Sequence, residues 1–287
     1  MGDLMSDVSI DLDAYFSRIG YEGSRKPTLA TLTGIQLAHA ISIPFENLNI
    51  LFGHGVQLGL ETLQDKIVGA ARGGYCFEQN GLALAVLRQL GFDASGLIGR
   101  VRWMLTPDVP APQTHMLIRV EIDGKTYIYD GGFGGIRMTG VLAFVPDLVQ
   151  HTCHEDHRIV QSGANYTIQA DLSGTGGGAE GANWADVVQF TMEPATSVDY
   201  ELSSWYTSTH PDSLFVNNLI VELPGEGVRR MIFNENFVER FTGQEQTITP
   251  ITSVDQMVSL LDAHFGLSVS GEKDRAILQK FIAGGSD

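Results

Sequence analysis

One stretch of the sequence carries a cysteine where a helix is predicted to begin. Residues 72–77 read RGGYCF, and an apolar helical pattern follows them. The two glycines permit a sharp turn into the helix, and a thiol in the first helical turn faces the positive end of the helix dipole. That position lowers the pKa of a thiol and favours the thiolate, the form that attacks acyl groups. Cys76 is therefore a candidate nucleophile, although a lone cysteine is more often an ordinary buried apolar residue.

A hairpin further along the chain supplies the partners that a thiol nucleophile needs. Residues 114–132 centre on Asp123 and Gly124, a strong signal for a two-residue turn. If that turn is of type I′, the pairing brings His115 and Asp130 to one face of the hairpin as diagonal neighbours. Their side chains are then within hydrogen-bond reach. A register shifted by one residue would place them on opposite faces.

Together, Cys76, His115 and Asp130 could form a catalytic triad. An aspartate beside a histidine fixes its tautomer and supports the imidazolium. A histidine beside a cysteine supplies a base or an ion-pair partner. Each residue has an ordinary alternative, because His115 could be a hydrogen-bonded core histidine and Asp130 a turn residue before two glycines. Since all three occur together, with glycines beside Cys76 and Asp130, we favour a thiol acyl-transfer site.

The overall composition limits the function classes. The 287 residues carry 34 acidic and 18 basic side chains, a formal net charge of −16 at pH 7. This balance argues against binding nucleic acid, which needs clustered Lys and Arg, and against docking on anionic lipid. No stretch approaches the ~20 apolar residues of a membrane helix, and residues 1–7 lack the basic start of a secretory signal. The two cysteines are too few for a disulfide framework, so we expect a cytoplasmic protein with reduced thiols.

Three zones of different periodicity must position these residues. The first zone is predicted to be helical, with helices over residues 28–43 and 76–90 and an earlier one that starts at Ser6 or Asp7 and includes Ile19. Short strands follow, over residues 95–101, 115–122, 125–130, 158–160, 166–170 and 184–190. The last zone combines strands over 215–223 and 228–233 with helices over 254–265 and 274–282.

Five motifs in this order resemble the arylamine N-acetyltransferase family. They are YFSRIG at residues 15–20, IPFENL at 43–48, RGGYC at 72–76, the pair His115 and Asp130, and residues 205–215 with Ser208, Pro211, Ser213 and Phe215. The resemblance runs from about residue 12 to the C-terminus. It implies an α+β multi-domain fold with a cysteine-protease-like Cys-His-Asp core. Its domains would be a helical bundle over 1–92 with the nucleophile, a β-barrel over 93–200 with the histidine and aspartate, and an α/β lid over 201–287.

The resemblance also implies an activity. Cys76 would take an acetyl group from acetyl-coenzyme A and pass it to an arylamine, arylhydrazine or arylhydroxylamine in a ping-pong reaction, with His115 as base and Asp130 orienting it. No metal is needed, and backbone N–H groups would hold the oxyanion. A hydrolase with the same Cys-His-Asp chemistry, an amide synthase on the same fold and a pseudo-enzyme stay open as alternatives. A homodimer is also left open.

By position within these motifs, two sets of residues become candidates for binding. An aromatic pocket for the acceptor would comprise Phe45, Trp103, Phe133 and Phe215, and ordinary core packing is the alternative. Contacts with coenzyme A would come from Thr114, Gly131, Gly132, Gly134 and His210. Many relatives carry Val or Ala where this chain has Gly131, so we expect residues 131–135 to be loosened. Three charged residues inside the motifs, Arg18, Glu46 and Arg72, are expected to form buried ion pairs.

The acidic chain raises the question of how coenzyme A phosphates are held. Between Arg158 and Arg229 there is no Lys or Arg. Backbone amides and nearby arginines would have to receive the phosphates, and the candidates are Arg100, Arg102, Arg137, Arg229 and Arg230. We therefore expect little electrostatic steering of the cofactor.

Two further patterns are weighed as weak signals. Residues 151–157 (HTCHEDH) contain possible zinc ligands, but a polar loop is the favoured interpretation because acids interrupt this short run. Residues 176–181 fit G-x-G-x-x-G, yet they lack the strand and helix of a dinucleotide site and are interpreted as a flexible loop.

Overall fold

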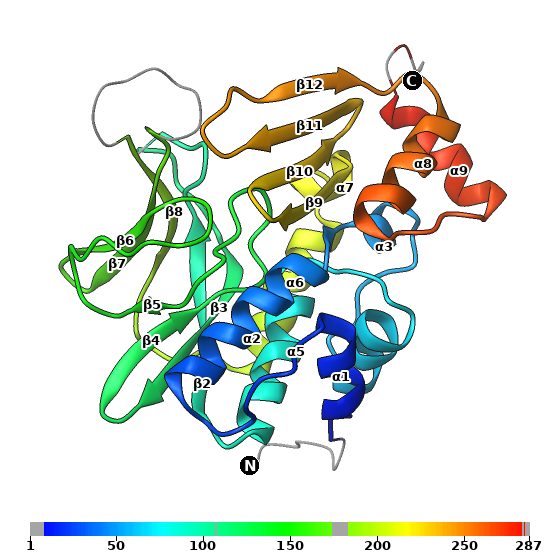
Figure 1. The fold of residues 1–287 in the computed structure, drawn as a ribbon. Coiled ribbons are helices and arrows are strands. Elements are labelled where there is room, and N and C mark those ends of the chain that lie inside the picture. Colours follow the sequence, from blue (N-terminus) through cyan, green and yellow to red (C-terminus); the bar gives the residue numbers. More distant parts are fainter. Residues whose placement is uncertain (1–8, 107, 174–182, 283, 285–287) are drawn as a thin grey trace.

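The computed structural model describes residues 9–106, 108–173, 183–282 and 284. Within them, helices pack against two antiparallel sheets (Figure 1). The seven-stranded sheet has the order β5-β4-β3-β2-β8-β7-β6, and the five-stranded sheet has the order β1-β9-β10-β11-β12. Isolated bridges from Pro146 to Ile159 and from Gln150 to His157 connect the segment after β5 with β6. The larger sheet is therefore a nearly closed barrel.

Residues 9–90 are mostly helical, as their periodicity predicts. The elements are α1 (Leu12–Ile19), α2 (Leu29–Ser42), β1 (Phe45–Glu46), α3 (Leu48–Leu51), α4 (Leu60–Leu63), the π-helical turn Gln64–Gly69 and α5 (Cys76–Gln89). The prediction that the first helix begins at Ser6 or Asp7 is wrong. It begins at Leu12, because the Asp11 carboxylate caps it by accepting the Ala14 N–H at 3.0 Å. Ser6 and Asp7 themselves lie outside the described residues.

The strands of the barrel lie in the predicted places, within a few residues at their ends, except that β5 is not predicted from the sequence. They are β2 (Asp93–Val101), β3 (Gln113–Ile122), β4 (Lys125–Tyr129), β5 (Leu142–Ala143), β6 (His157–Ser162), β7 (Asn165–Asp171) and β8 (Trp184–Phe190). The type I′ turn between β3 and β4 is confirmed, because Asp123 and Gly124 have positive φ angles of 50° and 71°. The predicted pairing of Ile122 with Lys125 is also confirmed.

The C-terminal part mixes helices with the second sheet. Its elements are α6 (Ser197–Thr209), α7 (Leu214–Asn217), β9 (Ile220–Gly225), β10 (Val228–Phe233), β11 (Asn236–Phe241), β12 (Thr247–Pro250), α8 (Val254–Phe265), α9 (Glu272–Leu278) and the 3₁₀ turn Gln279–Phe281. A strand from residue 215 is a wrong prediction, because the Ser213 hydroxyl accepts the Phe215 N–H and caps a helical turn instead. Strand β9 pairs with β1, so this sheet also contains residues 45–46 from the helical part.

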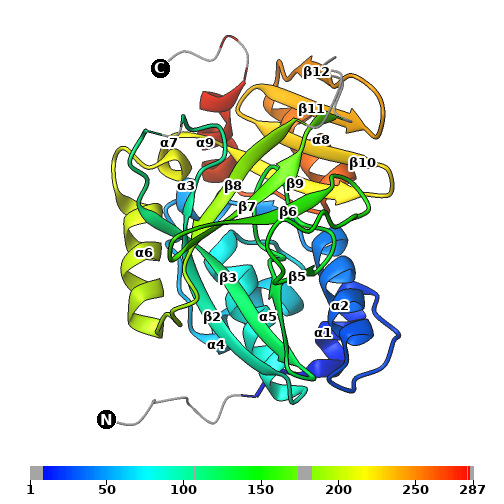
Figure 2. The same cartoon turned by 90° about the vertical axis from the view of Figure 1, so that its left-hand side faces the viewer.

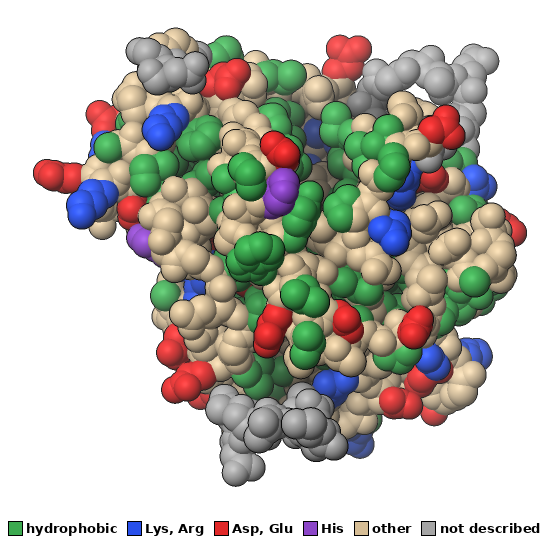
Figure 3. Space-filling model, turned by 180° about the vertical axis from the view of Figure 1, so that it is seen from behind, with side chains coloured by type: hydrophobic (Ala, Val, Ile, Leu, Met, Phe, Trp, Pro, Cys, Tyr) green, Lys and Arg blue, Asp and Glu red, His purple; other side chains and the backbone are tan. Residues whose placement is uncertain are grey.

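Helix α6 lies along the outside of the barrel, where it packs against β3 (Figure 2). It exposes a row of apolar side chains, with Val198, Leu202 and Trp205 between 60% and 67% exposed. Figure 3 shows apolar side chains along the middle of this face. A groove of about 1000 Å³ runs beside α6, and Phe77 and Trp205 are among its lining residues. The groove therefore reaches the first turn of α5. No helix in the described part of the chain is long and apolar enough to cross a membrane.

Gly124→Ala should lower the free energy of unfolding by about 1 kcal/mol, because a Cβ strains a backbone with positive φ. Urea unfolding measures the change. The control is Gly69→Ala, since Gly69 lies in a helical turn where a Cβ would make only an ordinary contact, 3.9 Å from the Gln64 carbonyl oxygen. This control should match the unchanged protein or exceed it slightly. Equal losses in the two variants would contradict the assigned turn.

Candidate active site

Cys76 is the first residue of α5, and the loop before it is tied to that helix. The Glu78 carboxylate accepts the Tyr75 N–H at 3.1 Å, and Lys66 Nζ donates to the same carboxylate at 2.7 Å. Cys76 is 3% exposed, and its Sγ lies 3.6 Å from the carbonyl oxygen of Thr114. The thiol therefore lies at the end of a helix and directly beside the first residues of β3.

His115 and Asp130 meet as the hairpin register predicts. His115 Nε2 lies 2.6 Å from Asp130 Oδ2, and both residues are buried. Burial alone lowers the pKa of His115 by disfavouring the imidazolium. The charge of Asp130, the hydrogen bond to it and the Cys76 thiol outweigh burial and raise the pKa of His115 to about 10. The imidazolium is thus the favoured form at neutral pH, with a carboxylate on one side and a thiol on the other.

Asn80 is a site residue that the motifs did not single out. Its Nδ2 donates to Asp130 Oδ1 at 2.9 Å and to the Met116 carbonyl at 2.6 Å. Its Oδ1 accepts the Gly131 N–H at 3.1 Å. Asn80 lies one helical turn after Cys76 and so on the same side of α5. That spacing was the available signal, and it could have identified a polar side chain facing the triad.

The loop over residues 131–135 is packed tightly, so the expected loosening at Gly131 is wrong. A Cβ on Gly132 would lie 3.1 Å from Cys76 Cα and 2.9 Å from Asn80 Nδ2. A Cβ on Gly131 would lie 3.0 Å from a ring carbon of His39. The buried His39 ring occupies the space that a larger residue at 131 would need. Glycine here allows close approach of the backbone and does not free the loop.

The structure brings the candidate aromatic residues around this site. Phe133 packs edge-on against His115 with ring centroids 5.0 Å apart. Phe45 lies 5.8 Å from Phe215 by the same measure. A Cβ on Gly134 would lie 2.7 Å from the Phe45 ring. Phe45 and Phe133 are buried, whereas Phe215 is half-buried.

Trp103 and His210 are only partly buried. Trp103 is half-buried, and its Nε1 lies 3.7 Å from where a Cβ on Gly135 would be. His210 follows the last residue of α6 and stacks on Tyr206 with centroids 4.6 Å apart. His210 Nδ1 also accepts the N–H of Asp212 at 3.2 Å. Trp103 thus lies beside the loop over residues 131–135, while the contacts of His210 are with residues close to it in the sequence.

The predicted ion pair of Arg72 with Glu46 is present, whereas the ion pair predicted for Arg18 is wrong, because Arg18 bonds backbone carbonyls. Arg72 Nη2 lies 2.8 Å from Glu46 Oε1, and Glu46 is fully buried. Burial raises the pKa of Glu46, but the charges of Lys66 and Arg72 outweigh burial and lower it overall. Arg18 donates to the carbonyls of Ile67 and Ser42 at 3.0 and 2.8 Å. These residues join α1, α2 and the loop before Cys76, so their role is structural.

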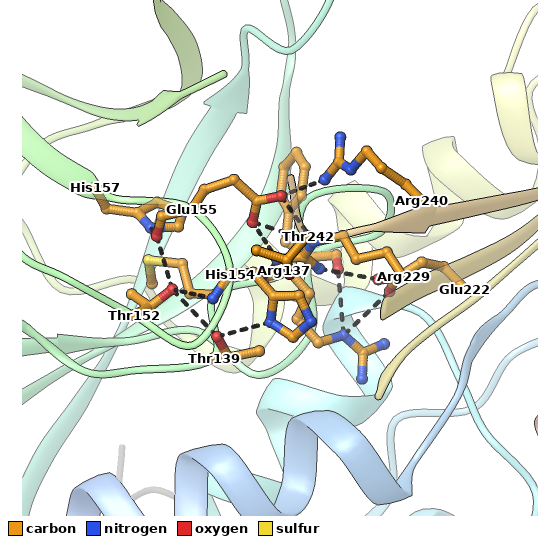
Figure 4. Close-up of polar contacts among 12 residues, drawn as sticks. Arg137, Thr139, Thr152, His154, Glu155, His157, Glu222, Arg229, Arg240 and Thr242 are labelled. Atoms are coloured by element: carbon orange, nitrogen blue, oxygen red, sulfur yellow. Dashed lines mark hydrogen bonds and ion pairs between the residues drawn. The ribbon is translucent and has the colours of Figure 1, made fainter. Parts of the chain in front are cut away.

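The arginines predicted to receive phosphates are engaged elsewhere, and this prediction is wrong for the two most buried ones. Arg137 and Arg229 join Glu155 and Glu222 in a buried ion cluster (Figure 4). The other candidates also have partners within the chain: the Ala111 carbonyl for Arg100, the Val109 and Thr106 carbonyls for Arg102, and Glu239 for Arg230. These five arginines therefore bond groups of the chain itself.

The histidines of residues 151–157 also make internal contacts. His151 Nδ1 lies 2.8 Å from Asp156 Oδ1, and His154 Nε2 donates to the Gly225 carbonyl at 3.0 Å. His157 Nδ1 donates to the Glu155 carbonyl at 2.9 Å. Among the described residues no group of three or more His, Cys, Asp or Glu is arranged to hold a metal. Residues 176–181, with the glycine pattern, lie outside the described part.

Comparisons with known proteins agree with this site. The family model "N-acetyltransferase" matches residues 28–275. The arylamine N-acetyltransferase of Mycolicibacterium smegmatis is 38% identical over 266 residues, which cover 91% of this chain and 94% of that one. The structure of Mycobacterium marinum arylamine N-acetyltransferase superposes with a TM-score of 0.89 at 34% identity, covering 95% of this chain and all of that one.

A second structure of the M. marinum protein, in complex with CoA, superposes with a TM-score of 0.88 at 34% identity and the same coverage. Sequence likeness of this extent and agreement over the whole fold lead to one conclusion. The chain belongs to the arylamine N-acetyltransferase family.

Proposed function

We propose that this protein transfers an acetyl group from acetyl-coenzyme A to the nitrogen of an arylamine, arylhydrazine or arylhydroxylamine. The observation that carries the proposal is the buried pair of His115 and Asp130 beside a thiol at the start of α5. Family membership supports the reaction, and the M. marinum relative solved with CoA supports the donor. We take Cys76, His115 and Asp130 as the catalytic triad, which is the Cys-His-Asp core of the fold.

In the first half-reaction Cys76 acts as nucleophile. Its thiolate attacks the thioester carbonyl of acetyl-coenzyme A and forms a new C–S bond. The oxyanion develops at the N-terminus of α5, where the first N–H groups of a helix lack partners within the helix. The tetrahedral intermediate then expels the thiolate of coenzyme A, which takes the proton of the His115 imidazolium. Acetyl-Cys76 and a neutral His115 remain.

In the second half-reaction the acceptor amine attacks acetyl-Cys76. Neutral His115 takes a proton from the attacking nitrogen, and the C–S bond breaks. The amide leaves, and the thiolate and imidazolium are restored. Asp130 holds Nε2 of His115 throughout, which leaves Nδ1 as the nitrogen that exchanges protons with the reacting atoms. The two half-reactions use the same site in turn, so the mechanism is ping-pong.

Substrate contacts are assigned from the positions of these residues in the family resemblance. The acceptor ring is proposed to lie among Phe45, Phe133, Phe215 and Trp103. The donor is proposed to contact Thr114, His210 and the glycines at 131, 132 and 134. Because the arginines near the site have partners within the chain, we assign the phosphates chiefly to backbone amides.

Other parts of the proposal concern organisation. The division into a bundle (1–92), a barrel (93–200) and a lid (201–287) accounts for the change from helices to barrel strands and then to the second sheet. We expect substrates to enter beside the loop over residues 131–135, which lies at the junction of these parts. A homodimer and a cytoplasmic location stay predictions.

Acetyl-coenzyme A without acceptor should leave a covalent acetyl group on Cys76. Intact-mass spectrometry should show a gain of about 42 Da, the mass of acetyl replacing hydrogen. Cys76→Ser should fold, show no gain and lose turnover of an arylamine. The matched control is Cys153→Ser, which changes the exposed cysteine and should behave as the unchanged protein.

An adduct that water removes faster than an arylamine does would favour the hydrolase alternative. An adduct that only an amine tethered within the same acyl group can discharge would favour the amide synthase. Arylamine acetylation retained in Cys76→Ser would contradict the nucleophile assignment.

Alkylation by iodoacetamide should separate the two cysteines by pH dependence. Because the pKa of His115 is raised to about 10, its imidazolium persists below that pH, and Cys76 should react at a nearly constant rate from about pH 6.5 to 8.5. Cys153 is exposed and lies outside this ion pair, so its profile is the comparison.

Asp130→Asn removes the charge that raises the pKa of His115, so the imidazolium is lost at lower pH. In this variant Cys76 should follow the profile of Cys153. Identical profiles for the two cysteines in the unchanged protein would contradict the ion pair.

A further inference from the structure

Arg137 is a buried arginine that the acetyl-transfer mechanism does not use. It lies in the loop after Asp130, and it is 0% exposed. Burial lowers the pKa of Arg137, and the negative charges of Glu222 and Asp130 oppose that effect. A guanidinium removed from water is costly unless its surroundings compensate it. Its partners therefore indicate what the buried charge holds in place.

Backbone carbonyls and one carboxylate surround the Arg137 guanidinium. Nη1 donates to the Ala40 carbonyl at 2.9 Å and to the Ile43 carbonyl at 2.7 Å, both at the C-terminal end of α2. Nε donates to the Phe133 carbonyl at 3.4 Å and lies 3.5 Å from Glu222 Oε2. The last carbonyls of a helix lack partners within the helix and attract cations. Arg137 thus fastens its own loop onto α2.

The C-terminal sheet holds the same loop from its other side. Arg229 Nη2 donates to the Arg137 carbonyl at 2.7 Å, and Arg229 pairs with Glu155 and Glu222 at 2.5 and 3.2 Å. Arg240 on β11 also pairs with Glu155. Figure 4 shows this continuous series of contacts from Arg240 to Arg137. The barrel, the C-terminal sheet and α2 all meet at residue 137.

The loop that Arg137 fastens is the one that carries the triad aspartate. Phe133, whose carbonyl Arg137 bonds, packs against His115. Asp130 lies 2.6 Å from His115, and the two glycines that follow it pack closely against Asn80 and His39. Arg137 fixes the chain beyond these glycines, so the segment from Asp130 to Arg137 is held at both ends.

The charge of the triad aspartate also acts on Arg137. Three arginines (Arg137, Arg229 and Arg240) are set against two glutamates (Glu155 and Glu222), and the charge of Asp130 further favours the Arg137 guanidinium. The charged and titratable groups facing Arg137 are Glu222 on β9, Arg229 on β10, Asp130 and Tyr129 at the end of β4, and His39 on α2. Burial and the charge of Arg137 lower the pKa of His39 to about 3, so His39 stays neutral.

We propose that Arg137 is a positioning residue for the nucleophile. By fixing residues 133–137 between α2 and the C-terminal sheet, it holds Phe133 and Asp130 against His115, so that the imidazolium stays paired with Cys76. The proposal rests on the proposed function only in taking Cys76 and His115 as the reactive pair. It does not depend on the identity of the acyl donor or acceptor.

The test is the pH profile of Cys76 alkylation by iodoacetamide in three variants. Site-resolved mass spectrometry measures the alkylation rate at Cys76. Arg137→Gln removes the positive charge and the hydrogen bonds of the guanidinium to α2 and to the Phe133 carbonyl. Arg137→Lys keeps the charge, but an ammonium cannot reproduce the planar fork that reaches α2, Phe133 and Glu222 together. Glu222→Gln is the matched control, because it disturbs the same ion cluster and leaves the contacts of Arg137 with the three carbonyls.

We expect Arg137→Gln to raise the midpoint of the Cys76 profile by about one pH unit, which slows alkylation about tenfold at pH values below the midpoint of the unchanged protein. Arg137→Lys should fall between this variant and the unchanged protein. Glu222→Gln should stay within about twofold of the unchanged rate at those pH values. If Arg137→Gln does not fold, the proposal is tested by comparing the midpoint shift of Arg137→Lys with that of Glu222→Gln.

Three results would overturn the proposal. They are equal shifts for the Arg137 variants and Glu222→Gln, a loss of thermal stability with an unchanged profile, and a midpoint that moves down. A downward shift would mean that only the direct charge effect on His115 was removed. A Cys76 that is unreactive in the unchanged protein would instead count against the proposed function.

Discussion

A buried hydrogen bond of 2.6 Å between His115 and Asp130 is the contact on which the rest of the site depends. Buried charges are costly to leave unpaired, so each atom of this pair needs a partner. The β3–β4 hairpin brings the two residues together. The Asn80 amide and the Gly132 N–H then satisfy the second carboxylate oxygen of Asp130, at 2.9 and 3.1 Å. With Asp130 satisfied, the remaining face of His115 is available to the thiol of Cys76.

Much of the fold and the centre of the site followed from local sequence rules. Asp123 and Gly124 adopt positive φ, which sets the turn type, and the turn type sets the register that joins His115 to Asp130. The start of α5 at Cys76 followed from the glycines before it. Helix α8 has the predicted bounds, because its apolar spacing agrees with its Ser253 cap and its terminal Gly266. In these places a few neighbouring residues decide the structure.

Features that depend on distant segments could not be predicted in this way. Arg137 is predicted from the sequence to receive phosphates, because it is one of the few basic residues near the site motifs. Its burial depends on carbonyls from α2 and on Glu222 and Arg229, far apart in the sequence. The tight packing of the loop beside Gly131 likewise depends on His39. Family likeness identified the motifs, but it did not indicate how this chain compensates for its own departure at Gly131.

The account depends most directly on the protonation state of His115. A titration of the histidine ring nitrogens by NMR, with the protein labelled with ¹⁵N in its histidines, would follow His115 between pH 5 and 10.5. The account predicts an imidazolium at pH 7, because the pKa of His115 is raised to about 10. It also predicts that Asp130→Asn makes this residue titrate at lower pH. A neutral His115 ring at pH 7 in the unchanged protein would contradict the pairing of thiol, imidazole and carboxylate.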